Sequence, residues 1–239
     1  MNSTKLTLTV FTLIASSTLC SAAEAPKAPA ATATKGEKPP ASPGWIIVEE
    51  EVWRPLRFEP LRSLDMARSH YRRNEESAAA NEIDKATSWL KLAESTASPA
   101  DKEKLTSVAS ELSTLAKDIR SGDIVAAEKL DGELGKAAQA LAGWHYSRAK
   151  DAQGKNNDAD AGHDLELAAA YLQHAANSAH VEFGPDVQEV ITRTYRHGKL
   201  TSESATVQHD NLGKDLQQIE KAIHDLGEQM VKAAKVAKS

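Results

Sequence analysis

Histidines are the residues of this chain whose type and spacing could support chemistry. Met66 and His70 are four residues apart, which places both side chains on one face of a helix. His163 and His174 are eleven apart and again share nearly one face. Because ligands one helical turn apart can reach the same ion, these spacings permit a metal or haem site.

The metal hypothesis has four candidate ligands: His70, His145, His163 and His174. The chain has no Cys-x-x-Cys-His haem-attachment motif and no Glu-x-x-His pair of the kind found in di-iron bundles. Glu220, His224 and Glu228 are spaced by one turn each, but they lie off the apolar stripe of their helix. Their position favours a solvated face, and we predict no cofactor.

Two His-Tyr pairs, His70-Tyr71 and His145-Tyr146, precede two copies of one helical phrase. An unperturbed imidazole changes charge near pH 6.5, so a paired histidine could sense pH. The favoured interpretation is structural. Each ring is expected to pack at a hairpin seam and to hydrogen-bond across it, and Trp144 beside His145 supports this.

The phrase itself runs from Glu82 to Ala93 and again from Asp164 to Ala175. Both copies place an acid, Ile or Leu, Ala, an aromatic residue, Leu and Ala at the same positions, which indicates a repeated architecture and no particular reaction. The matching aromatics, Trp89 and Tyr171, are expected to fill the core. The second copy follows its His-Tyr pair by seven extra residues. We expect a loop longer by seven and, since seven is close to two turns, repeated faces in register.

Apolar residues recur at alternating intervals of three and four positions, which predicts a succession of helices. The expected ranges are 58–74, 77–96, 98–122, 125–153, about 159–180, 185–198 and 204–237. Ser98 and Pro99 suit the cap and first position of their helix. A period near 3.5 favours antiparallel packing, so the predicted fold class is all-α: an antiparallel helical bundle built from two related helical hairpins. Two copies without a period of 34 argue against an open solenoid.

A long C-terminal amphipathic helix is predicted within 204–239. Its apolar stripe consists of Leu212, Leu216, Ile219, Ile223, Leu226, Met230 and Ala233. The favoured interpretation makes it the last helix of the bundle. A dimerising coiled coil is the alternative, which would give a homo-oligomer or a protein partner through this helix. Binding to a membrane surface is a third possibility.

The N-terminus resembles a secretory signal peptide over residues 1–23. Lys5 precedes an apolar stretch over residues 6–15, and cleavage is expected after Ala23. The only cysteine, Cys20, lies in the removed segment; a lipid anchor on Cys20 is the less favoured alternative, because Leu19 precedes it. We expect a periplasmic or secreted protein without stable membrane insertion after cleavage.

Residues 24–44, rich in Ala and Pro, predict a flexible tether, and residues 45–239 form the predicted helical bundle domain. The cluster after Trp45 predicts an extended strap at the start of that domain. The net charge of −5 argues against a nucleic-acid partner. No Gly-x-Ser-x-Gly, P-loop or dinucleotide motif occurs, so the chain is not expected to be an enzyme.

The phrases Trp144-His145-Tyr146, 161–165 and 171–175 resemble a group of exported, Ala-rich bacterial helical proteins without an assigned activity. The two-hairpin plan is similar, more distantly, to the periplasmic YfdX proteins, which are linked with stress and acid tolerance. These resemblances imply no catalytic residues. Together with the pattern, they favour an exported, non-catalytic helical binding or stress-related module. A metal- or haem-binding bundle and a coiled-coil scaffold are the alternatives.

Overall fold

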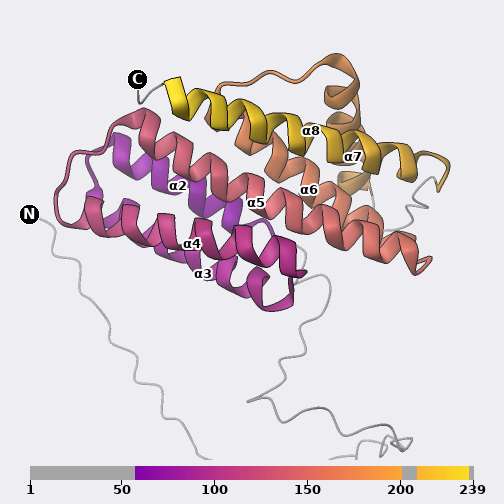
Figure 1. Cartoon of the computed structure of the whole chain (residues 1–239), viewed down its shortest axis with the longest axis horizontal. Coiled ribbons are helices and arrows are strands. Elements are labelled where there is room, and N and C mark those ends of the chain that lie inside the picture. Colours follow the sequence, from indigo (N-terminus) through magenta and orange to yellow (C-terminus); the bar gives the residue numbers. More distant parts are fainter. Residues whose placement is uncertain (1–56, 201–208, 237–239) are drawn as a thin grey trace, which may run out of the picture. The chain divides into compact units, whose positions relative to one another are not determined.

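The structure is a computed structural model that describes residues 57–200 and 209–236. Helices make up most of these residues and no strand occurs among them, which confirms the predicted all-α class (Figure 1). The expected signal peptide, the tether and the strap up to residue 56 lie outside the described residues. No helix in the described part is long and apolar enough to cross a membrane.

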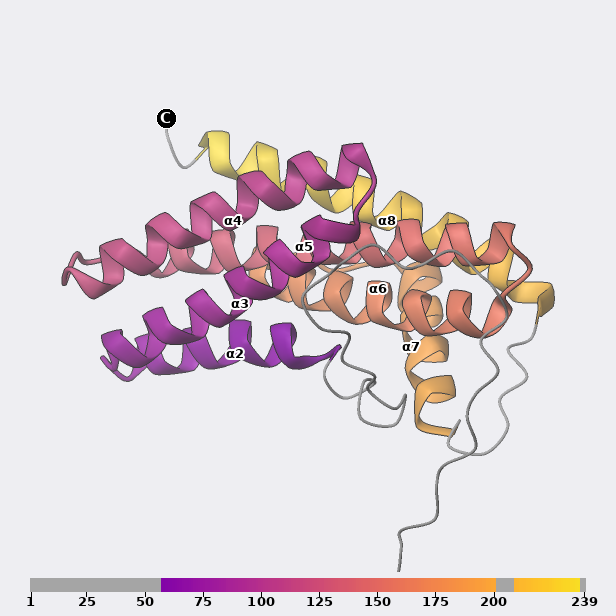
Figure 2. The same ribbon diagram turned by 90° about the horizontal axis from the view of Figure 1, so that it is seen from below.

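Seven helices follow one another in the described residues. They are α2 (Glu59–Arg72), α3 (Glu76–Thr96), α4 (Pro99–Arg120), α5 (Ala127–Gly154), α6 (Asp158–Ala179), α7 (Pro185–Leu200) and α8 (His209–Val236). α2, α3 and α4 pack in chain order, α5 pairs most extensively with α6, and α8 contacts α5, α6 and α7 (Figures 1 and 2). The bounds agree closely with the periodicity of apolar residues, and the expected start of the last helix at 204 lies outside the described residues.

Local chemistry explains several helix ends. Ser98 caps α4, where its hydroxyl accepts the backbone N–H of Asp101 at 3.2 Å, and Pro99 takes the first helical position as expected. Gly122 stops the same helix with a φ of +81°, a left-handed conformation that glycine adopts without steric cost.

The two hairpins have turns of equal length, which corrects the expectation of a longer second loop. Residues 73–75 join α2 to α3, and residues 155–157 join α5 to α6. Each turn contains an asparagine in the left-handed region: Asn74 with φ 59° and Asn156 with φ 57°. Since the turns are equal, the seven extra residues all lie in α5. They lengthen this helix by about two turns and so leave the direction of its buried face unchanged.

The repeated positions occupy equivalent places in the core. Ile83 and Leu165 are buried, as are the matching leucines and alanines. Tyr171 is fully buried, as expected of a core residue. Trp89 is only half-buried, so the prediction that both aromatics fill the core is wrong for Trp89. Its ring lines a pocket that is described below.

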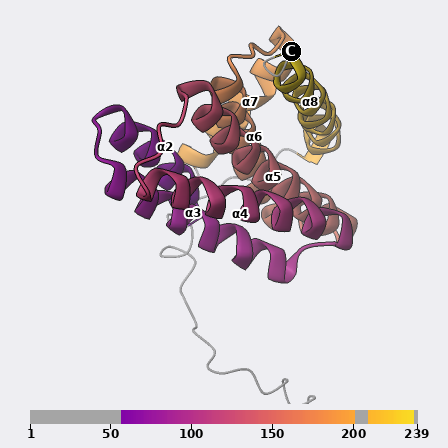
Figure 3. The same ribbon diagram turned by 60° about the vertical axis from the view of Figure 1, so that its left-hand side comes forward.

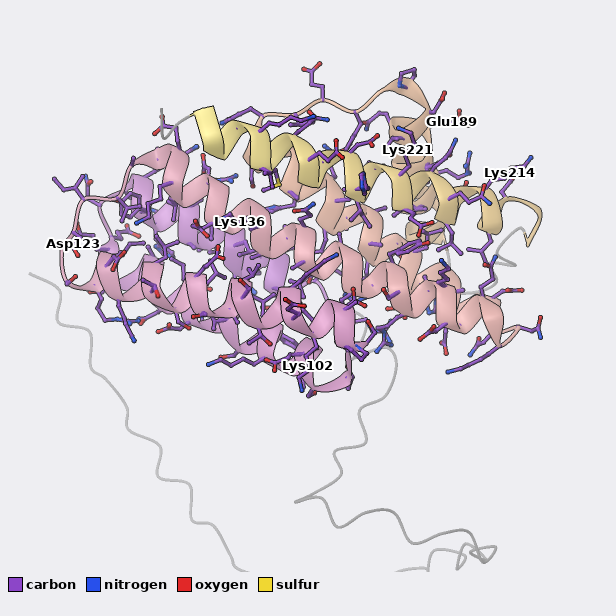
Figure 4. All side chains as sticks on the ribbon, viewed as in Figure 1. Lys102, Asp123, Lys136, Glu189, Lys214 and Lys221 are labelled. Atoms are coloured by element: carbon purple, nitrogen blue, oxygen red, sulfur yellow. The ribbon has the colours of Figure 1, made fainter. Side chains whose placement is uncertain are left out.

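The apolar stripe of α8 packs against the bundle. Leu212, Leu216, Ile219 and Leu226 are each less than 5% exposed, and α8 lies on the opposite side of α5 and α6 from α3 (Figure 3). Its outer face carries lysines such as Lys214 and Lys221, which project into solvent (Figure 4). Four of the seven residues of the stripe that a coiled-coil dimer would use are therefore buried within one chain, which favours the interpretation as the last bundle helix.

Two glycines of α5, Gly132 and Gly135, differ in their surroundings. A Cβ on Gly135 would lie 3.1 Å from Ser178 Cβ and 3.2 Å from Met230 Cε, whereas a Cβ on Gly132 meets nothing within 4 Å. We expect Gly132→Ala to raise the free energy of unfolding by about 0.5–1 kcal/mol, because alanine loses less backbone entropy in a helix.

Gly135→Ala serves as the matched control on the same helix. The same gain in helix propensity is offset there by crowding against Ser178, so its stability should fall below that of Gly132→Ala. Urea unfolding of both variants checks the pair. Equal stabilisation would contradict the close packing of α5 against α6 and α8 at Gly135.

Candidate functional site

A buried histidine–aspartate pair joins the two helices of the second hairpin. His145 of α5 and Asp164 of α6 are 3% and 2% exposed, and His145 Nδ1 lies 2.8 Å from Asp164 Oδ1. The expectation that this histidine hydrogen-bonds across a hairpin seam is confirmed. His70 differs, since its ring bonds Glu75 in the turn that follows α2. The seam prediction is wrong for His70.

Arg148, one turn after His145, completes the charged group. Its Nε lies 3.2 and 3.1 Å from the two carboxylate oxygens of Asp164. The guanidinium also stands over the ring of Trp144, 5.0 Å from the centroid, in a cation–π arrangement. Asp164 therefore accepts hydrogen bonds from two side chains of the facing helix, and both of these side chains contact aromatic rings.

The protonation states of His145 and Asp164 follow from their burial and from the charges around them. Burial lowers the pKa of His145 despite the hydrogen bond with Asp164, and the charges of Arg148 and Arg57 act in the same direction. Burial alone would raise the pKa of Asp164, but the bond with His145 and the nearby arginines lower it. At neutral pH the carboxylate is thus ionised and balanced by Arg148, while His145 is neutral and donates its Nδ1–H.

Aromatic rings form an open pocket beside this pair. The pocket has a volume of about 150 Å³ and lies between α3 and the second hairpin. Trp89 of α3 and Tyr171 of α6, the two aromatics of the repeat, both line it, together with Trp144 of α5. Tyr171 stacks on the His145 ring, with centroids 5.4 Å apart and planes 16° from parallel. The internal repeat therefore supplies two of the aromatic residues that line one pocket.

The polar wall of the pocket is rich in donors. Arg57, His145 and Arg148 line it, and none of its described lining residues is Asp or Glu. Tyr171 donates its hydroxyl to the backbone carbonyl of Arg57 at 2.9 Å, which holds the backbone of Arg57 beside the pocket. Among the described residues, the buried indole N–H of Trp144 finds no acceptor.

A second polar cluster connects α2 to the second hairpin. Arg68 bonds Asp131 Oδ1 through Nε at 2.5 Å and Ser178 Oγ through a terminal nitrogen at 2.7 Å. His174 Nδ1 lies 3.3 Å from Asp65, and its buried Nε2 has no partner in the described part of the chain. Because Asp131 and Ser178 belong to different helices, Arg68 ties α2 to both α5 and α6.

The candidate metal ligands do not share one site. His70 is bonded to Glu75, His145 to Asp164, and His174 is paired with Asp65. His163 is half-buried on α6. In the described ranges no three His, Cys, Asp or Glu side chains are grouped so that they could hold a metal ion. His224 is 71% exposed beside Asp225 and Glu228, which agrees with a solvated face.

Sequence patterns identify His145 as a candidate residue, but they do not identify Asp164 and Arg148, which form the charged group with it. Arg148 follows by three positions on the same helix, a spacing that signals a shared face. Asp164 is the acidic position of the second repeat copy. Its counterpart, Glu82, is paired instead with Lys85 on its own helix. The Asp164 side chain is also more deeply buried, 3% exposed against 16% for Glu82, and the repeat pattern alone does not contain this difference.

These features define an all-α bundle with a buried His145–Asp164 pair, bonded to the partly exposed Arg148, next to an aromatic pocket. No family model matches the chain, and no match was found among curated proteins or among solved structures. The chemistry of this site is therefore the basis for inferring a function.

Proposed function

We propose that the protein is a non-catalytic binding module of the periplasm or the exterior of the cell, and that it holds a small aromatic molecule in the pocket. The observation that carries the proposal is the set of rings from three helices, Trp89, Trp144 and Tyr171, around an open volume of about 150 Å³. An apolar cavity of that size is sufficient for a single benzene ring.

The chemistry of the walls supports binding over catalysis. Aromatic side chains offer large apolar contact area and stack on a planar guest. His145 lines the pocket with its Nδ1 bonded to the Asp164 carboxylate, but the described lining includes no Ser, Cys or Lys to serve as a nucleophile beside it. A pocket with rings and few polar groups fits the usual composition of ligand sites.

Benzamide, a neutral single-ring probe, tests this proposal. We expect saturation-transfer NMR to detect binding of benzamide to the full-length chain. The substitution Trp89→Ala should raise the dissociation constant about three- to tenfold. Trp89 is half-buried, so its removal opens the pocket wall without removing a core residue. Helical circular dichroism would confirm that the variant is folded.

Tyr146→Ala is the matched control, because it removes an aromatic ring from α5 that does not line the pocket. Benzamide should bind this variant as it binds the unmodified protein. No transfer at tens of millimolar probe, or equal transfer in Trp89→Ala, would refute the proposal.

A second candidate, a response to acid stress, is favoured by a separate observation. Two buried imidazoles, His145 and His174, each face a carboxylate at a contact between helices. Protonation of either ring adds charge where little water is available to solvate it. The pH prediction in the Discussion tests this candidate.

A further inference from the structure

We infer that the pocket prefers a phenol, a ring with its own hydroxyl donor, because Nε2 of His145 is a hydrogen-bond acceptor at the pocket wall. This inference rests on the proposed function, since it concerns the ligand of the same pocket. It starts from the two nitrogens of one buried ring. Nδ1 of His145 is bonded to Asp164 at 2.8 Å, whereas Nε2 has no hydrogen-bond partner among the described residues.

The bond to Asp164 orients the imidazole with respect to the pocket. His145 lines the pocket, and Asp164 is not among the described residues that do so. The two nitrogens of an imidazole point in widely divergent directions, so with Nδ1 turned to the carboxylate, Nε2 lies on the side of the ring that meets the pocket. Tyr171 stacks on this ring and the Trp144 ring centroid lies 4.5 Å from its own, so both neighbours hold the imidazole in this orientation.

The same bond determines which nitrogen carries the proton. The Asp164 carboxylate, which Arg148 also contacts, is ionised and can only accept hydrogen bonds. Neutral His145 therefore donates from Nδ1 and keeps a lone pair on Nε2. The charges of Arg148 and Asp164 balance each other, so hydrogen bonding at Nε2 is the feature of this group that distinguishes between ligands.

A lone pair beside apolar walls makes the pocket sensitive to the groups on its ligand. Trp89, Leu141 and Trp144 offer apolar contact to any small ring. A ring without a donor would exclude water from Nε2 and leave this acceptor unsatisfied, which costs free energy. A phenol fills the same volume and donates its hydroxyl to Nε2, so it gains the apolar contact and keeps the hydrogen bond.

The test compares phenol with fluorobenzene and anisole, two single rings that lack a donor, against the full-length protein at pH 7.5. A phenolic hydroxyl titrates near pH 10, so phenol keeps its proton under these conditions. We expect phenol to bind about fivefold more tightly than either of the other rings, the size of one neutral hydrogen bond. Saturation-transfer NMR with increasing probe concentration gives the three dissociation constants. Phenol binding that is equal or weaker would overturn the inference.

The nitrogen resonance of Nε2 provides a direct readout in isotopically labelled protein. An unprotonated ring nitrogen becomes more shielded when it accepts a hydrogen bond, so this resonance should move upfield on addition of phenol. Anisole should not produce the upfield shift, because it has no hydroxyl proton to donate. The resonance is assigned as the one that is lost in His145→Asn. An Nε2 resonance that phenol leaves in place would contradict the inference.

Variants at two buried histidines locate the preference. His145→Asn removes the acceptor and keeps a donor to Asp164, since the asparagine amide takes the place of Nδ1 and no atom replaces Nε2. This variant should bind phenol and fluorobenzene about equally. His174→Asn is the matched control, because it removes a buried imidazole that does not line the pocket, and it should keep the preference for phenol. Circular dichroism verifies the fold of both variants, and the ligand series tests the inference whether or not they fold.

The outcomes separate this inference from the proposed function. If fluorobenzene, anisole or benzamide binds and phenol binds no more tightly than fluorobenzene and anisole, the phenol inference is wrong and the aromatic pocket stands. If none of the rings binds, both fail. A preference for phenol that survives in folded His145→Asn would place the acceptor on another residue and would also overturn the inference.

Discussion

Asp164→Ala is expected to lower the free energy of unfolding by about 3 kcal/mol, because it removes the partner of two side chains at once. His145 Nδ1–H would remain buried without an acceptor, and Arg148 would lose the carboxylate that both of its bonds reach. His145 is 3% exposed and has little access to replacement water. Urea unfolding followed by circular dichroism gives the measurement.

Asp84→Ala provides the matched control for this substitution. Asp84 also pairs with an arginine, Arg120, at 2.6 Å, but both side chains are about half exposed. Exposed ion pairs contribute little, so its loss should cost less than about 1 kcal/mol. A similar cost for the two variants would mean that burial does not strengthen the Asp164 group.

Acid is expected to destabilise the fold beginning below about pH 6.5, through His145 and His174. Burial lowers the pKa of both rings, although Asp164 faces the first and Asp65 and Asp131 are near the second. Arg148 and Arg57 oppose protonation of His145, and Arg68 opposes that of His174.

The sign follows from proton counting. A histidine whose pKa is lower in the folded state than its unfolded value near 6.5 binds fewer protons when folded. The stabilisation is therefore complete above pH 6.5 and declines as pH falls, by at most about 1.4 kcal/mol per pH unit for each ring. Asp164, with its lowered pKa, adds a further loss below its ordinary value of 3.8.

Urea unfolding at intervals between pH 7.5 and pH 5 measures this dependence. The double variant His145→Asn, His174→Asn should flatten the slope, because asparagine does not titrate and its amide can still donate to Asp164. His224→Asn, at a 71% exposed position, should leave the slope unchanged. Stability that is constant over this range in the unmodified protein would rule out the acid-responsive candidate.

Local sequence patterns were sufficient to predict the helices and one residue of the site, His145. The spacing of apolar residues by three and four positions predicts the helices, while Ser98 with Pro99 and Gly122 mark the ends of one of them. These signals act within a few positions along the chain, so they need no tertiary information. His145 could be placed at a hairpin seam because the His-Tyr pair precedes a repeated buried face. Its counterpart, His70, bonds within a turn, a difference that depends on Glu75 and not on the repeat.

The sequence by itself determined an all-α chain with two related hairpins, since apolar spacing states which faces must be buried. The sequence did not determine which helices cover these faces. Trp89 and Tyr171 lie in different hairpins and line one pocket only after α3 has packed against α5. Only the tertiary structure decided that the Asp164 carboxylate is enclosed while Glu82 remains partly exposed, because desolvation depends on the atoms that surround a group in space.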